Sequence, residues 1–192
     1  NFIMISAILL AAGQSKRMEG ENKLIKKIHG VPLIKLSVKN ILTSAVDELI
    51  IILGYQREII EKLIDKNKKI KLVFNKDFES GIASSIKTGL NHMSKKTTAF
   101  FICLGDMPLV NQDIYNLLIK SKNNKEIIIP TYKGQQGNPI LFLISMKEKI
   151  MTIQGDVGAK KILELNKDKI VSVQIDDQNI TKDFNTKENF NF

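Results

Sequence analysis

Short, continuous apolar runs alternate along this chain with stretches whose apolar residues recur at helical spacing. Continuous runs of this length are typical of strands buried on both faces of a sheet. Between them, residues such as Ile34, Val38 and Ile41 form an amphipathic helical stripe. This alternation predicts βαβ crossovers, and hence an α/β fold with a mostly parallel sheet covered by helices. Strands are expected over 3–10, 49–53, 72–74, 99–104 and 127–129.

The length of the chain favours a single domain. No linker rich in Pro, Gly or Ser divides the 192 residues, so one domain over 1–192 is expected. The longest apolar run, near the start, is far shorter than the roughly 20 residues of a membrane span, and no basic segment precedes it as in a signal peptide. The only cysteine, Cys103, lies inside an apolar run and is expected to be buried and inert. We therefore expect a cytoplasmic protein without membrane attachment.

The charge balance favours anionic partners. Lys and Arg number 29 against 20 Asp and Glu, which gives a net charge of +9. The densest basic run, over 66–71, has no interleaved aromatic residues and no recognisable nucleic-acid-binding module around it. We expect that run to be a solvated surface and do not expect a nucleic-acid partner.

The first apolar run ends abruptly in a loop of small and cationic residues. Ala11-Ala12-Gly13-Gln14-Ser15 leads to Arg17 and, beyond Gly20, to Lys23. Backbone amides of such a loop, with a bidentate Arg and a mobile Lys, suit a phosphate group. The loop matches neither the dinucleotide fingerprint nor the P-loop, and an ordinary turn after the first strand is an alternative.

Ligands of open α/β sheets bind beyond the carboxyl ends of the strands. Three loops, at 13–23, 75–85 and 105–109, should face one crevice there. Asp106 directly follows a predicted strand, so its carboxylate is either a ligand for Mg²⁺ or a cap for the turn into Pro108. Ser84 and Asp156 each have a competing interpretation as a helix N-cap, Asp156 for the helix through Ile162 and Leu165.

Several segments, in register along nearly the whole chain, resemble the nucleotidyltransferases of molybdenum cofactor synthesis. The nearest branch is molybdenum cofactor cytidylyltransferase. The resemblance implies a nucleotide-diphospho-sugar transferase-like fold, a Rossmann-like three-layer sandwich with an antiparallel edge. The matching segments are 10–18, 22–24, 30–33, Asn75 with 81–85, 105–109, 137–139, 155–159 and 183–189.

The resemblance also implies a set of site residues. It assigns catalysis to Arg17, Lys23 and Asp106, and Mg²⁺ binding to Asp106 and Asn185. It assigns acceptor binding to Asn138 and Asp156. Nucleotide binding is implied for Leu10, Ala11, Ala12, Gly13, Ser15, Lys23, Asn75, Gly81, Ser84 and Ser85.

The implied reaction transfers CMP from CTP to the terminal phosphate of the molybdenum-pterin cofactor and releases pyrophosphate. The product would serve a molybdenum hydroxylase, met in a transient contact. Guanylyl enzymes of the family tend to have Gly where this chain has Ala12, which favours cytidine. The alternatives are a transferase that uses GTP, one that acts on a sugar or alditol phosphate, and a non-catalytic cofactor carrier. Two departures from the family pattern, Asn138 and Lys187, leave the carrier as an alternative, and a third, Asn185, replaces a charged metal ligand with a neutral one.

Overall fold

The computed structural model of the protein describes residues 4–15, 21–121 and 124–184. Two predicted site residues, Arg17 and Asn185, lie outside the described residues, so their assignments stay predictions. The described residues form an α/β fold, as the sequence predicts.

The centre of the fold is a mixed, eight-stranded sheet with the order β10-β7-β9-β6-β1-β4-β5, with β8 paired to β7. A separate hairpin pairs β2 with β3. The register is continuous along the central strands, so that Leu9 of β1 lies between Ile51 of β4 and Cys103 of β6. The strands are β1 (Ile5–Ala11), β2 (Lys27–Ile28), β3 (Val31–Pro32), β4 (Glu48–Leu53), β5 (Ile70–Phe74), β6 (Ala99–Leu104), β7 (Ile127–Tyr132), β8 (Gln135–Gln136), β9 (Ile140–Leu143) and β10 (Ile170–Gln174).

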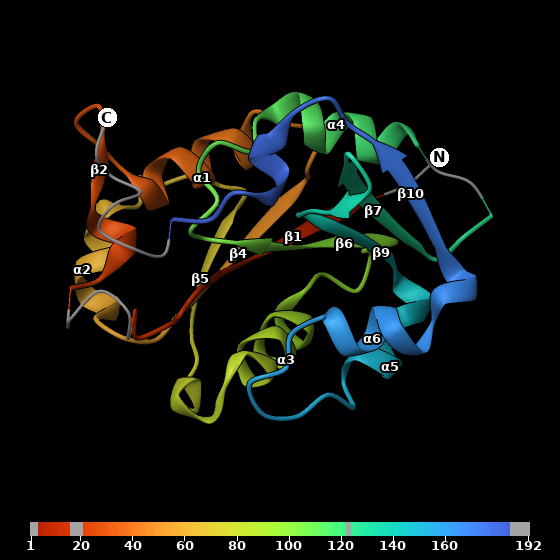
Figure 1. Ribbon diagram of the computed structural model, residues 1–192. Helices are drawn as coiled ribbons and strands as arrows, with labels where there is room; N and C mark the ends of the chain where they lie inside the picture. Colours follow the sequence, from red (N-terminus) through yellow and green to blue (C-terminus); the bar gives the residue numbers. More distant parts are fainter. Residues whose placement is uncertain (1–3, 16–20, 122–123, 185–192) are drawn as a thin grey trace.

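Helices cover both faces of the sheet and complete a three-layer sandwich (Figure 1). One face carries α1 (Leu33–Leu42), α2 (Arg57–Leu63) and α4 (Gln112–Lys120). The other carries α3 (Ile82–His92), α5 (Lys147–Ile150) and α6 (Lys160–Leu165). None of the helices in the described part of the chain has the length and apolar character that a membrane crossing requires.

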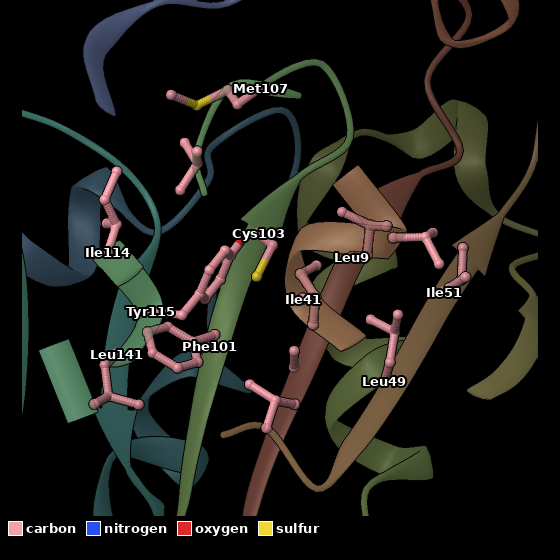
Figure 2. Packing of buried hydrophobic residues seen from close by; sticks show 14 of the residues in the cluster. Leu9, Ile41, Leu49, Ile51, Phe101, Cys103, Met107, Ile114, Tyr115 and Leu141 are labelled. Carbon is pink, nitrogen blue, oxygen red and sulfur yellow. The ribbon is translucent and has the colours of Figure 1, made fainter. Parts of the chain in front are cut away.

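The strand period of two divides the core between these faces. In β1, Ala7 and Leu9 pack towards α1 and α4, whereas Ile8 packs towards α3. Figure 2 shows the first of these clusters, in which Leu9, Phe101 and Cys103 meet side chains from α1 and α4. Every residue of β4 is buried, as the continuous apolar run predicts. Burial of one such side chain contributes about 1.5–3 kcal/mol.

Two sequence-based predictions about the sheet are wrong in detail. The antiparallel strand β9 lies inside the sheet, between β6 and β7, and the edge strand β10 is parallel to β7. β5 is not buried on both faces, because it is an edge strand with β4 as its neighbour in the sheet. Its side chains Leu72 and Phe74 are 37% and 38% exposed, and the guanidinium of Arg57 lies 4.4 Å from the centre of the Phe74 ring.

Candidate active site

A cavity of about 560 Å³ lies at the carboxyl ends of the parallel strands. Its walls come from the loops after β1, β5 and β6, which the sequence predicts to face one crevice. Asp156 and Asp183 from the second half of the chain complete it. The predicted site residues on its walls are Leu10, Ala12, Gly13, Ser15, Lys23, Gly81, Ser85, Asp106 and Asp156.

The loop after β1 directs Lys23 into the cavity. Ser15 has a left-handed backbone, and its Oγ accepts a hydrogen bond from the backbone N–H of Lys23 at 3.1 Å. Asn22 is buried and caps the 3₁₀ helix Lys23–Ile25, because its Oδ1 accepts from the N–H of Leu24 at 3.0 Å. Both contacts fix the backbone from which the Lys23 side chain extends.

The carboxylate of Asp106 meets that side chain. Its Oδ2 lies 2.5 Å from Nζ of Lys23, and the two side chains are 13% and 19% exposed. Of the two interpretations of Asp106, the structure favours a carboxylate that faces the cavity over one that caps its own turn. The backbone carbonyl of Asp106 accepts a hydrogen bond from the N–H of Phe184 at 2.9 Å, which joins the Asp106 loop to the C-terminal segment.

Close packing brings the Asp106 loop against the end of β1. The N–H of Gly105 donates to the carbonyl of Leu10 at 3.1 Å. A Cβ at position 105 would lie 2.8 Å from that carbonyl oxygen, so only glycine allows this approach. Gly105 therefore sets how near Asp106 comes to the loop after β1.

Asn75 holds the start of α3 from inside the protein. Its Nδ2 donates to Oγ of Ser84 at 2.8 Å and to Oγ of Ser85 at 3.0 Å, and its Oδ1 accepts from the N–H of Asp77. Asn75 is 3% exposed, and neither Asn75 nor Ser84 is among the residues that line the cavity, whereas Ser85 is. The N-cap position of α3 is Gly81, so the alternative interpretation of Ser84 as the N-cap is wrong.

The structure also corrects the alternative interpretation of Asp156. The N-cap position of α6 is Ala159, and the carboxylate of Asp156 instead reaches α3, where Oδ1 accepts from the N–H of Ile82 at 3.3 Å.

Two other predicted residues lie away from the cavity wall. Ala11 is 1% exposed and is part of the core, and Asn138 is not among the lining residues. Asn138 lies between β8 and β9, where its N–H donates to the carbonyl of Ile180 at 2.8 Å. Asn138, which is predicted to bind the acceptor, therefore lies outside the cavity that Asp156 lines.

Some lining residues were not predicted. Gln14 and Glu79 both line the cavity and are joined by a hydrogen bond, which Nε2 of Gln14 donates to Oε1 of Glu79 at 2.9 Å. Phe78 and Asp183 also line it. Asp183 lies in a segment that carries the family resemblance, and this is the one signal that points to it. Gln14, Phe78 and Glu79 lie in the loops 13–23 and 75–85 that the sequence predicts to face the crevice, but no feature singles them out within those loops.

The donor set suits a divalent cation that arrives with phosphate. Mg²⁺ prefers hard oxygen ligands and is usually held by one or two carboxylates together with substrate phosphates and water. Asp106 supplies such a carboxylate on the cavity wall. Within the described ranges, no group of three or more His, Cys, Asp or Glu residues is placed to hold a metal ion by itself. The residues therefore fit a metal that shares its coordination with substrate.

Comparison with known proteins decides the family. The description "MobA-like NTP transferase domain" matches residues 7–172. The chain belongs to this family. The match runs from β1 into β10 and includes the loops that carry Lys23, Asp106 and Asp156.

Named relatives agree with the family, and a solved structure shares the fold. A protein of Methanosarcina acetivorans, described as a probable molybdenum cofactor guanylyltransferase, is 26% identical over 153 residues, which are 78% of this chain and 67% of that protein. One of Natranaerobius thermophilus with the same description is 32% identical over 134 residues, 68% of this chain and 62% of that protein. A Mycobacterium tuberculosis protein solved in complex with manganese has a TM-score of 0.82 at 19% identity, and the match covers 97% of this chain and 96% of that one. The chain spans about two thirds of the length of the two curated relatives.

Proposed function

We propose that this MobA-like domain is a Mg²⁺-dependent nucleotidyltransferase that transfers CMP from CTP to the terminal phosphate of the molybdenum-pterin cofactor. The observation that carries the proposal is the meeting of Lys23 and Asp106 in a cavity at the carboxyl ends of the parallel strands. A cation and a carboxylate in that place suit a polyphosphate with its bound metal.

In the proposed reaction, an oxygen of the acceptor phosphate attacks the α-phosphorus of the nucleotide, and the bond to the leaving pyrophosphate breaks. The acceptor is a phosphate monoester with a second pKa of about 6, so it is largely anionic at neutral pH and needs no strong general base. The work left to the protein is alignment and neutralisation of charge. Lys23, the amides after β1 and, by prediction, Arg17 supply that charge.

The metal would be held by Asp106 and, by prediction, by Asn185. When bound, it neutralises negative charge on the phosphate oxygens. Support for this assignment comes from the carboxylate on the cavity wall and from the manganese complex of the structurally similar mycobacterial protein. Asp183 lines the same cavity and adds negative charge at the side where Asp106 lies.

The choice of nucleotide has two candidates. Ala12, where guanylyl enzymes of the family tend to have Gly, favours CTP, whereas the descriptions of two relatives as guanylyltransferases favour GTP. Ala12 lines the cavity, but it is only 4% exposed and also packs in the core cluster that contains residues of α3. Ala12 would therefore influence the base through the packing of this wall.

The experiment is a measurement of pyrophosphate release from CTP and from GTP, each with Mg²⁺ and the pterin cofactor. The expected result is release that requires the cofactor and is faster with CTP. Faster release with GTP would move the assignment to the guanylyl alternative. Release with a sugar or alditol phosphate in place of the cofactor would change the acceptor class, and cofactor binding without release would identify a carrier. Transient contact with a molybdenum hydroxylase and a cytoplasmic location remain predictions from the sequence.

A further inference from the structure

The loop before α6 lies directly on the start of α3, although more than 70 residues separate them in the sequence. The carbonyl of Gly155 accepts a hydrogen bond from the N–H of Ala83 at 3.1 Å. Oδ1 of Asp156 accepts from the N–H of Ile82 at 3.3 Å. The first amides of a helix have no partners inside the helix, so this distant loop supplies partners that the local sequence does not.

The contact is close as well as hydrogen-bonded. A Cβ at Gly81 would lie 2.5 Å from the carbonyl carbon and oxygen of Gly155 and 2.6 Å from the backbone nitrogen of Asp156. Gly81 also has a φ of +111°, in the region that disfavours residues with a side chain. There is therefore no space for a side chain at position 81 between the loop and the helix.

The start of α3 is held from both sides. From the interior, Asn75 donates to Ser85 at 3.0 Å and to Ser84 at 2.8 Å. From the surface, the carboxylate of Asp156 caps the first turn, where a negative charge is favoured by the helix dipole. Ser85 lies on the cavity wall, so the two contacts together set where this wall stands.

We propose that Asp156 is a positioning residue for the nucleotide side of the cavity and does not bind the acceptor. It acts through the first turn of α3, which places Gly81, Ile82 and Ser85 on the wall of the cavity that Lys23 and Asp106 also line. The inference rests on the proposed function, because it assumes that the cavity holds a nucleotide. It assigns to the segment around Asp156 a role in nucleotide affinity, although this segment belongs to the half of the chain expected to meet the acceptor.

The test compares Asp156→Ala with Asp156→Asn. Asparagine keeps an Oδ1 that accepts from the N–H of Ile82, whereas alanine removes the cap. We expect Asp156→Ala to weaken CTP binding, measured by calorimetry with Mg²⁺ and without acceptor, by about 3–30-fold, the range that loss of a cap spans. Asp156→Asn should bind CTP within about two-fold of the wild type, and kcat and the acceptor KM should stay near wild-type values in both variants.

A matched control separates positioning from loss of stability. Asn111 caps α4 through hydrogen bonds from the N–H groups of Asp113 and Ile114, and α4 supplies no residue to the cavity wall. Asn111→Ala should lower the melting temperature as Asp156→Ala does, but leave the CTP Kd unchanged.

Three results would overturn the inference. Unchanged CTP binding in Asp156→Ala together with a raised acceptor KM would make Asp156 an acceptor ligand. An Asn variant as weak in CTP binding as the Ala variant would exclude a role through the cap. If Asn111→Ala weakened CTP binding as much as Asp156→Ala does, the effect of Asp156→Ala would reflect a general loss of stability. If the wild type itself binds neither CTP nor GTP, the proposed function fails, which the wild-type titration shows before any variant is made.

Discussion

The ammonium of Lys23 lies 2.5 Å from the carboxylate of Asp106, and the two residues are 83 positions apart in the sequence. The pair joins the loop after β1 to the loop after β6 at the wall of the cavity. Both side chains are mostly shielded from solvent, so their charges act in a medium that screens them less than water does. The first two predictions concern the two members of this pair.

Asp106→Asn is expected to retain the fold and to lower turnover by about 100-fold or more, because the lost charge acts in a transition state governed by electrostatics. Asparagine has nearly the same shape, so the fold should be kept, but the melting temperature should fall because Lys23 loses its charged partner. The measurement is pyrophosphate release at saturating Mg²⁺. Turnover equal to that of the wild type under these conditions would contradict the assignment of Asp106 to the metal.

Lys23→Ala is expected to slow transfer more than it weakens CTP binding, since an ammonium near the α-phosphate gains most as charge develops there. Single-turnover rates and equilibrium titration with CTP measure the two effects separately. Arg17→Ala should raise KM as well. If Lys23→Ala changed KM alone, Lys23 would be a residue of ground-state binding.

Ala12→Gly is expected to narrow the preference for CTP over GTP. A Cβ built at Gly54 would lie 2.7 Å from the Cβ atoms of both Ala12 and Phe78, so these two residues of the cavity wall pack as one unit. Removal of the methyl group loosens that unit. A steric effect of one methyl group changes the ratio of the kcat/KM values for two substrates by about 10–200-fold. Competition between the two nucleotides measures the ratio.

The matched control for that variant is Ala7→Gly. Ala7 lies in β1, which ends just before Ala12, and is fully buried, but it packs on the opposite face of the sheet and does not line the cavity. Ala7→Gly should lower the stability of the protein without altering its preference for CTP over GTP. An unchanged ratio in Ala12→Gly would remove Ala12 from the explanation of base choice.

Glu48 is expected to make stability depend on acidic pH. Burial opposes its ionisation, but hydrogen bonds from Lys71, Ser94 and Ser6 outweigh this and hold the pKa of Glu48 below its usual value of 4.5. Because the folded pKa is lower than the unfolded one, the carboxylate stabilises the fold above about pH 4.5, and the contribution is lost as the pH falls through the folded pKa.

Glu48→Gln should therefore cost about 1–3 kcal/mol near neutral pH and flatten the loss of stability below pH 4.5. Denaturant unfolding at pH 7 and at pH 4 measures both. Glu126→Gln is the comparison, since hydrogen bonds from Lys169 and Ser145 also lower the pKa of Glu126, but its side chain is 26% exposed against 6% for Glu48. A Glu48 variant with the same acid sensitivity as the wild type would contradict this role.

Cys103 is expected to resist alkylation in the folded protein. The thiol is 1% exposed, and burial raises its pKa to about 12, so thiolate is scarce at pH 8. Iodoacetamide labelling followed by mass spectrometry should show modification in denaturant and very little without it. Rapid labelling of the native protein would contradict its assignment as an inert core residue.

The fold class and the location of the candidate site can be predicted from the amino-acid sequence alone. Runs such as 99–104 read as a buried strand because continuous apolar character is a local property, and β6 has these same bounds. The rule that ligands collect at the carboxyl ends of strands then placed Lys23, Ser85 and Asp106 on one cavity. These inferences need only the residues of each segment and the direction of the chain.

Which distant groups come into contact depends on the complete fold. No local pattern shows that β9 inserts between β6 and β7, or that Asp156 caps α3 instead of α6, because both depend on contacts between remote segments. Similarly, asparagine is a residue type that often binds ligands, but the side-chain amide nitrogen of Asn75 donates its hydrogen bonds to Ser84 and Ser85. A polar side chain bonds to whichever partner the packing of the sheet brings within about 3 Å, and that partner is chosen by the whole fold.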